Sequence, residues 1–202
     1  MAASNETLPS DEAALIAQCR AGDTSAFDEI VRRHKDCVYN VVYRWLGNHE
    51  DAQDIAQEVF VRAYRGMDGF EGRAKISTWL FRIAANLARN RLRDRGRKGR
   101  NRGVSLDALE EDAPGAAQTA AAETATPRDA AMHGELERAL AACLGKLPEH
   151  YRMAFVLRVQ EGLAYDAICD SLECPLGTLK SRLNQARALL RGCLERQGVL
   201  EP

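Results

Sequence analysis

Two carboxylates and an amide lie on one side of the helix that the apolar spacing predicts at residues 54–64. Asp54, Gln57 and Glu58 share an arc with Val61, and the opposite arc is apolar: Ile55, Ala56, Val59, Phe60 and Ala63. Acidic side chains around an exposed valine suit a docking surface for a basic protein partner. A solvated helix face is the alternative interpretation, because charged outer faces are common on surface helices.

A second group combines an aromatic ring, two amides and three guanidinium groups on the helix predicted from Ser77. Its outer arc contains Trp79, Arg82, Asn86, Arg89, Asn90 and Arg93. A tryptophan can stack on an unpaired base, amides can read base edges, and arginines can hold phosphate. Basic residues continue along the chain, with eight between Arg89 and Arg102 against one acid, Asp94. The pattern favours a nucleic-acid surface; the alternative is a tryptophan that caps the core beside solvated arginines.

A third group lies on the final helix, expected at 177–194. Its outward residues are Lys180, Ser181, Asn184, Gln185, Arg187 and Arg191, opposite a stripe of Leu179, Leu183, Ala186 and Leu190. A short helix at 165–172 and a tight turn at 173–175 precede it, which is the order of a helix-turn-helix. Short polar and amide side chains flanked by cations are typical of a recognition helix. A plain amphipathic helix is the alternative.

No set of residues resembles an active site or a metal site. The sequence contains no Walker loop, no nucleophile elbow and no His-Glu-x-x-His pair. The histidines fall in four separate segments and are interpreted as surface residues: His34, His49, His133 and His150. We therefore expect no enzyme activity, no cofactor and no metal.

The cysteines form no Cys-x-x-Cys pair, and they lie at positions 19, 37, 143, 169, 174 and 193. We interpret them as small core residues in a reducing compartment. A surface thiol that senses oxidation is the alternative.

The elements that carry these groups are predicted to be helical, so the expected fold class is all-α. The 202 residues divide into a helical bundle at 11–100, a linker at 101–133 and a helix-turn-helix bundle at 134–196. Residues 110–131 contain no Leu, Ile, Val, Met or aromatic side chain, so this segment cannot form a core and is predicted to be flexible. It is also acidic, with six acids against one base between Ser105 and Asp129.

Apolar periodicity and turn residues predict the individual helices at 11–21, 24–47, 50–67, 77 into the arginine run, 136–147, 149–161, 165–172 and 177–194. Thr24 or Ser25 is expected to cap the second of them, and Pro114, Gly115 and Pro127 are expected to interrupt any helix in the linker.

No apolar run has the length of a membrane span, and the first residues lack the features of a signal peptide. We therefore expect a cytoplasmic protein with no direct insertion into a membrane.

Motifs in both bundles resemble the extracytoplasmic-function group of bacterial RNA polymerase sigma factors, within the sigma-70 family. In the first bundle they are DAQDIAQEVFVRAY at 51–64 and FEGRAKISTWLFRIAAN at 70–86. In the second they are LPEHYRMAF at 147–155 and CPLGTLKSRL at 174–183. The resemblance covers nearly the whole chain outside the N-terminal tail and the linker, and several motifs in this order are more specific than a lone helix-turn-helix.

The resemblance implies a role for each surface. The positions that match the grip on the β′ coiled coil of core polymerase are Asp54, Gln57, Glu58 and Phe60. Phe70–Asn90 matches the segment that opens the promoter −10 element and captures a flipped base. The positions that match −35 reading are Lys180, Ser181, Asn184 and Gln185. The family also implies contact with the β flap and an anti-sigma factor, which can be membrane-bound.

Three positions depart from the family pattern. Asn184 and Gln185 stand where the family often has an aromatic residue or an arginine, and Ile76 stands where an aromatic residue is frequent. These departures leave the promoter sequence open but not the role of the helices.

Two functions from different classes are considered, with an enzyme as a distant third. The first is a dissociable initiation subunit of RNA polymerase, and the second is a freestanding helix-turn-helix transcriptional regulator. The surface of Trp79, Asn86 and Asn90 favours the first, because a regulator of duplex DNA has no use for a single-strand platform.

The acidic linker is expected to be disordered in the free protein, so that the two bundles move independently unless an inhibitor holds them together. In the holoenzyme, the family implies that the linker passes through the nucleic-acid channel of the polymerase. A solubilising tether is the alternative.

Overall fold

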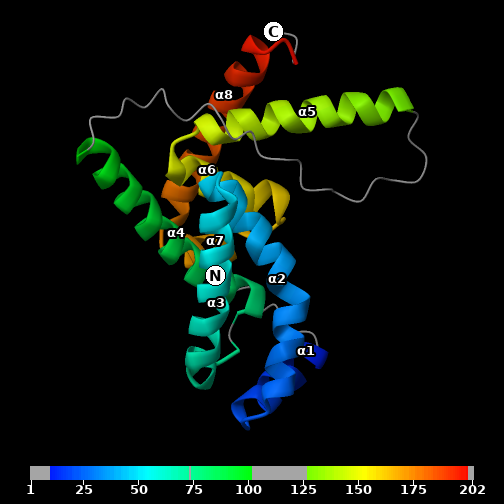
Figure 1. Ribbon diagram of the computed structural model, residues 1–202, viewed down its shortest axis with the longest axis vertical. Coiled ribbons are helices and arrows are strands. Elements are labelled where there is room, and N and C mark those ends of the chain that lie inside the picture. Colours follow the sequence, from blue (N-terminus) through cyan, green and yellow to red (C-terminus); the bar gives the residue numbers. More distant parts are fainter. Residues whose placement is uncertain (1–9, 73, 102–126, 200–202) are drawn as a thin grey trace.

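The computed structural model describes residues 10–72, 74–101 and 127–199, which are helical over most of their length (Figure 1). These residues contain no strand, so the predicted all-α fold class is confirmed. The predicted acidic linker lies largely outside the described residues. Within the described part of the chain, no helix is both long enough and apolar enough to cross a membrane.

The described residues of the first lobe, as we call residues 10–72 and 74–101, form four α-helices and one short 3-10 helix. They are α1 (Ser10–Arg20), α2 (Thr24–Leu46), α3 (His49–Gly66), η1 (Met67–Gly69) and α4 (Ile76–Asn101). The cap of α2 is Asp23, whose side chain accepts a hydrogen bond from the backbone N–H of Ser25. The prediction of Thr24 or Ser25 as the cap is therefore wrong by one or two residues. Gly47, at φ 67°, ends α2 in the left-handed conformation that glycine adopts readily.

The second lobe, residues 127–199, carries the predicted helix-turn-helix. Its elements are α5 (Pro127–Lys146), α6 (Glu149–Phe155), a π-helical turn η3 (Val156–Gln160), α7 (Tyr165–Leu172) and α8 (Leu176–Arg196). Glu173, at φ 50°, makes the left-handed turn that separates α7 from α8. Because α5 begins at Pro127, the prediction that residues 110–131 are flexible is wrong for residues 127–131. Proline is well suited to the first helical position, where no backbone N–H is needed.

The larger of two apolar cores crosses from one lobe into the other. In the first lobe it contains fully buried side chains such as Trp45, Leu80 and Phe81. The same cluster continues through Leu157 and Ile168 of the second lobe and reaches the start of α8. A smaller cluster at the outer end of the second lobe joins α5, α6 and α8.

Polar contacts also join the lobes. Helix α7 packs along α4, where Ser171 Oγ donates a 3.3 Å hydrogen bond to the carbonyl of Thr78. Glu161 accepts from Cys37 Sγ at 2.9 Å and from Arg44 Nη1 at 3.4 Å. The expectation that the lobes are independent in the free chain is wrong for this conformation, because a shared core and polar contacts fix their arrangement.

The cysteines do not all follow the prediction of core thiols. Cys143 and Cys193 form a disulfide, whereas Cys19, Cys37, Cys169 and Cys174 are half-buried and outside any disulfide. The interpretation as reduced core residues is therefore wrong for the first pair.

Candidate functional site

The acidic face predicted on α3 is present on the surface of the first lobe. Asp54, Gln57 and Val61 are exposed, and the side chain of Glu58 is 43% accessible. They line a shallow open depression between α3 and α4 together with Arg62 and Arg91. The opposite side of α3 is buried through Ala52, Ile55, Val59 and Ala63.

Phe60 is half-buried and packs against the larger core, at the edge of the predicted apolar arc. Its ring is therefore partly accessible beside the acidic face. The structure brings all four candidate docking residues of α3 onto or next to one surface.

Two arginines of α4 brace this face, and sequence reasoning missed them. Arg91 and Arg95 both form ion pairs with Asp51, whose side chain is 13% accessible, and Arg91 also approaches Asp54 at 3.8 Å. Arg95 donates to the carbonyl of Leu46 at 3.3 Å. Arg95, one of the eight basic residues between Arg89 and Arg102, is therefore engaged within the first lobe. No local signal reveals these pairs, because the partners are about forty residues apart in sequence.

The tryptophan expected to be exposed on α4 is half-buried. Trp79 stacks on Phe70, with ring centroids 4.7 Å apart, and packs against the larger core. A Cβ added at Gly66 would lie 3.4 Å from the Trp79 ring, so glycine leaves room for it. The prediction of an open stacking platform is wrong in this conformation, because one face of the indole is covered by Phe70.

The remaining candidate residues of α4 lie nearer to solvent. Arg82, Asn90 and Arg93 are exposed, while Asn86 and Arg89 are half-buried. Arg89 donates to Asn86 Oδ1 at 3.0 Å, and Arg82 lies 3.9 Å from Glu173 in the turn of the helix-turn-helix. One end of the candidate surface therefore faces the second lobe.

All the candidate residues of α8 lie on its solvent side. Lys180, Ser181, Asn184, Gln185, Arg187 and Arg191 are exposed, and the predicted stripe of Leu179, Leu183, Ala186 and Leu190 is buried. The turn through Glu173 sets the direction of α8 relative to α7, and it leaves the polar face of α8 uncovered. The helix can therefore enter a groove of DNA as a recognition helix does.

The described residues include no group of three or more His, Cys, Asp or Glu side chains that could hold a metal ion. The shallow surface depressions there are lined mainly by paired charges, such as Asp51 with Arg91 and Arg95. This chemistry is suited to macromolecular contact over exposed helix faces.

Comparisons with known proteins match this geometry. The family model for sigma-70 region 2 matches residues 30–98, and that for sigma-70 region 4 matches residues 137–190. The first match contains the candidate faces of α3 and α4, and the second contains the helix-turn-helix with nearly all of the α8 face.

Two curated relatives match almost end to end. The RNA polymerase sigma-H factor of Pseudomonas aeruginosa is 35% identical over 90% of this chain and 92% of its own length. The sigma factor SigW of Bacillus subtilis, an ECF RNA polymerase sigma factor, is 38% identical over 87% of this chain and 92% of its own.

The fold also resembles that of CnrH, solved in complex with the cytosolic domain of CnrY. The TM-score is 0.65 at 23% identity, over 93% of this chain and 99% of CnrH. At this identity, the likeness concerns the fold alone. The two family models and the curated relatives go further, and they show that the chain belongs to the extracytoplasmic-function sigma factors, the subunits that direct bacterial RNA polymerase to promoters.

Proposed function

We propose that three helix faces, on α3, α4 and α8, have separate roles in this sigma factor, and that it acts by binding rather than as an enzyme. The observation that carries this proposal is the exposure of the whole polar face of α8, together with an acidic face on α3 whose side chains are accessible. Its partners are core polymerase and promoter DNA, so its place of action is the cytoplasm.

The acidic face of α3 docks on core polymerase at the β′ coiled coil. Asp54 and Glu58 supply charge for basic groups of the partner, Gln57 supplies hydrogen bonds, and Phe60 with Val61 supplies apolar contact. The braces from Arg91 and Arg95 fix α4 against α3, so the face is rigid before it binds.

The outer side of α4 engages the −10 element. Asn86 and Asn90 are placed to read an unpaired base, and Arg82, Arg89 and Arg93 supply cations for phosphate. Trp79 contributes by its stack on Phe70, which supports the exposed end of this surface. Because Arg82 is close to Glu173 in the packed arrangement, the second lobe moves away from α4 when the −10 element binds.

The α8 face reads the −35 element in duplex DNA. Lys180, Ser181, Asn184 and Gln185 reach base edges, and Arg187 with Arg191 holds phosphate. The second lobe also contacts the β flap of core polymerase.

The unit that docks and melts DNA comprises residues 11–100, and the unit that reads the −35 element comprises residues 134–196. The residues at the start of α5, from Pro127, belong with the second unit because they continue its first helix. The linker from 101 onward joins the two units.

An anti-sigma factor is a further partner of this chain, and the relevant observation is that CnrH was solved with the cytosolic domain of CnrY. A membrane-bound inhibitor of this kind would cover the α3 face or hold the lobes together.

Run-off transcription with purified core polymerase on a library of promoter fragments tests the proposed function. We expect transcripts that depend on added protein and on both promoter elements. Duplex binding without any transcript from core polymerase would instead indicate a freestanding regulator.

A further inference from the structure

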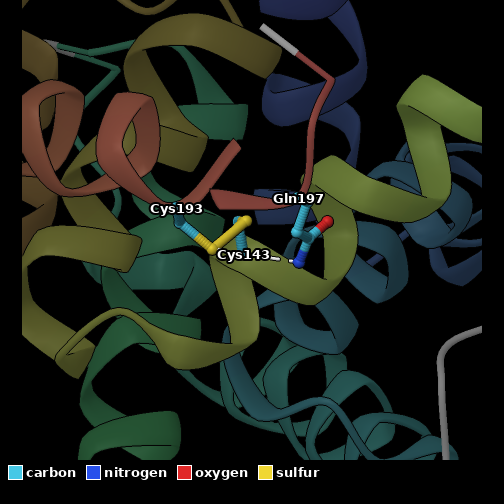
Figure 2. Close-up of a disulfide and its surroundings, with 3 residues drawn as sticks. All are labelled: Cys143, Cys193 and Gln197. Carbon is cyan, nitrogen blue, oxygen red and sulfur yellow. Dashed lines mark hydrogen bonds between the residues drawn. A yellow bond between two sulfur atoms is a disulfide. The ribbon is translucent and has the colours of Figure 1, made fainter. Parts of the chain in front are cut away.

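The only disulfide among the described residues joins the two helices at the outer end of the second lobe. Cys143 of α5 and Cys193 of α8 are fifty residues apart in sequence, and their Cα atoms are 5.9 Å apart (Figure 2). The same lobe contains two cysteines outside any disulfide, Cys169 and Cys174. The oxidised pair is therefore one particular pair among several cysteines.

This bond crosses a core that is small. The buried residues of the cluster are Cys143, Leu144, Leu147, Phe155, Ala186, Leu190, Cys193 and Leu194. A cluster of this size gives little stability by itself, because small cores bury too little apolar surface to offset the entropy of ordering the chain. The attachment of α5 to α8 therefore depends strongly on the covalent bond.

The bond also lies on the helix that carries the −35 surface. Leu190 and Cys193 face the small core, while Arg187 and Arg191 on the same turns of α8 are exposed. Loss of the α5 support leaves the last turns of α8 with less apolar contact. The orientation of this end of α8 is therefore coupled to the state of the bond.

Access to the sulfurs is easier from the end of α8. Cys143 is 1% exposed and Cys193 is 7% exposed. The exposed side chain of Gln197, one residue beyond α8, places Nε2 4.0 Å from Cys193 Sγ (Figure 2). Terminal turns of helices open more readily than their interiors, so fraying at the end of α8 uncovers Cys193 first.

Competition from the thiols of Cys19, Cys37 and Cys169 is weak. Burial and the hydrogen bond to Glu161 raise the pKa of Cys37 to about 12, and burial raises the pKa of Cys19 and of Cys169. Because the thiolate is the nucleophile in disulfide exchange, these three groups react slowly at neutral pH.

We propose that the Cys143–Cys193 disulfide is a reversible redox site that exchanges with a dithiol reductant and sets −35 recognition by α8. This inference rests on the proposed role of α8. The oxidised lobe holds α5 on α8 and binds the −35 element, and the reduced lobe binds it more weakly. Core binding through α3 is the same in both states, because α3 has no contact with the small core.

The exchange is a two-electron transfer. A thiolate of the reductant attacks Cys193 Sγ, the S–S bond breaks, and its electron pair leaves on Cys143 Sγ, which takes up a proton. The second thiolate of the reductant attacks the mixed disulfide, and Cys193 leaves as a thiolate and is protonated. The reductant becomes a disulfide. Hydrogen peroxide reverses the change, since two thiols and one peroxide give a disulfide and two waters.

The test measures promoter binding by holoenzyme assembled from core polymerase and the full chain. Wild-type protein is prepared oxidised and after dithiothreitol treatment, and mass spectrometry counts the free thiols. Two promoter fragments, with and without a −35 element, separate −35 recognition from the rest of binding. The variants are Cys143→Ala with Cys193→Ala, and Cys19→Ala as a control outside the lobe.

We expect reduction of the wild type to lower the preference for the −35 fragment several-fold, with affinity for core polymerase unchanged. The double variant should show the reduced value in both conditions, and Cys19→Ala should follow the wild type. Reduction changes no amino acid, so the result does not depend on the folding of a variant.

Equal −35 preference in oxidised and reduced wild type overturns the proposal, and so does a bond that dithiothreitol leaves intact in the folded protein. Failure of the proposed function gives a different result, in which oxidised wild type shows no −35 preference or does not bind core polymerase.

Discussion

The first lobe and the outer end of the second lobe differ in what holds their helices together. In the first lobe, α2, α3 and α4 surround large, fully buried side chains such as Trp45 and Phe81, and ion pairs from Arg91 and Arg95 close its surface. At the outer end of the second lobe, α5 and α8 share a small cluster and a disulfide. The comparison indicates that a large core and ion pairs hold the helices of the first lobe, whereas a small cluster and one covalent bond hold the outer end of the second lobe.

The two lobes share the larger apolar core in the middle of the molecule. Helix α7 packs on α4 over the larger core, so half of the helix-turn-helix is stabilised by the first lobe (Figure 1). Helix α8 is therefore held from two sides, by the larger core through α7 and by the smaller cluster that it shares with α5 and α6.

The largest effect is expected from Trp45→Ala in the shared core. Trp45 is fully buried, and truncation of such a side chain costs about 3–5 kcal/mol of unfolding free energy. Because the core is continuous, α7 should lose protection from hydrogen exchange together with α2. Chemical denaturation and exchange measurements check this, with the exposed Val61→Ala as a near-neutral control. Retained protection of α7 would mean that the lobes do not share a core.

The disulfide variant tests the other region of the comparison, the outer end of the second lobe. Replacing Cys143 and Cys193 by alanine should cost about 2–4 kcal/mol, confined to α5, α6 and α8, because the cross-link no longer restricts the unfolded chain. Hydrogen exchange of α5 and α8 measures the loss, and α3 amides serve as the internal reference. A loss of the same size in α3 would show that the two ends are not separable.

Docking should depend on the α3 face without changing the fold. The double variant Asp54→Lys, Glu58→Lys should weaken binding to core polymerase by about 2 kcal/mol. Two attractive negative charges on α3 become positive charges that repel a basic partner. Circular dichroism should stay the same, since both side chains point outward. Asp28→Lys, on an exposed part of α2, is the matched control. Unchanged affinity of the double variant would remove the docking assignment.

Variants of α8 should distinguish the residues that read bases from those that hold phosphate. Asn184→Ala or Gln185→Ala should change the preferred base at one −35 position by about 1–3 kcal/mol. Arg187→Ala should weaken binding to all promoters alike. The slope of log affinity against log salt concentration should fall in magnitude by about one. Selection over randomised −35 sequences makes the comparison. The wild-type sequence preference in both amide variants would contradict the assignment.

The smallest effect is expected at the contact between the lobes. Glu161→Gln removes the ion pair with Arg44, at a cost of about 1 kcal/mol for a contact near the surface. It should also lower the pKa of Cys37 from about 12, because the neighbouring negative charge is lost, while burial, the largest cause of the raised pKa, remains. Alkylation of Cys37, followed by mass spectrometry at several pH values, should become faster, with Glu50→Gln as control.

The same raised pKa predicts a pH dependence. The folded chain binds the Cys37 proton more tightly than the unfolded chain, so this stabilisation is present at low pH and is lost as the pH rises from about 9 toward about 12. An alkylation rate of Cys37 that follows the pH profile of an ordinary thiol would show that the lobes are not packed around Glu161.

Helix boundaries and helix faces were largely predictable because both depend on short-range spacing. The α8 face is exposed residue for residue as its periodicity predicts, and the acidic arc of α3 is exposed except for the half-buried Glu58. The failures are of another kind. Trp79 lies on the outer arc of α4, but Phe70, nine residues earlier and outside the helix, covers one side of its ring. A helical wheel contains no information on what a neighbouring loop places against a helix.

The sequence by itself determined the all-α fold class, the helix-turn-helix, the two candidate DNA faces and the resemblance to sigma factors. These follow from residue types at spacings of a few positions, where the 3.6-residue period fixes which side chains share a face. The tertiary structure alone decided which distant groups meet. Arg91 reaches Asp51 forty residues away, Cys143 reaches Cys193 across fifty, and Ser171 reaches Thr78 across ninety-three. Such pairs depend on how the helices pack in space, which local periodicity does not specify.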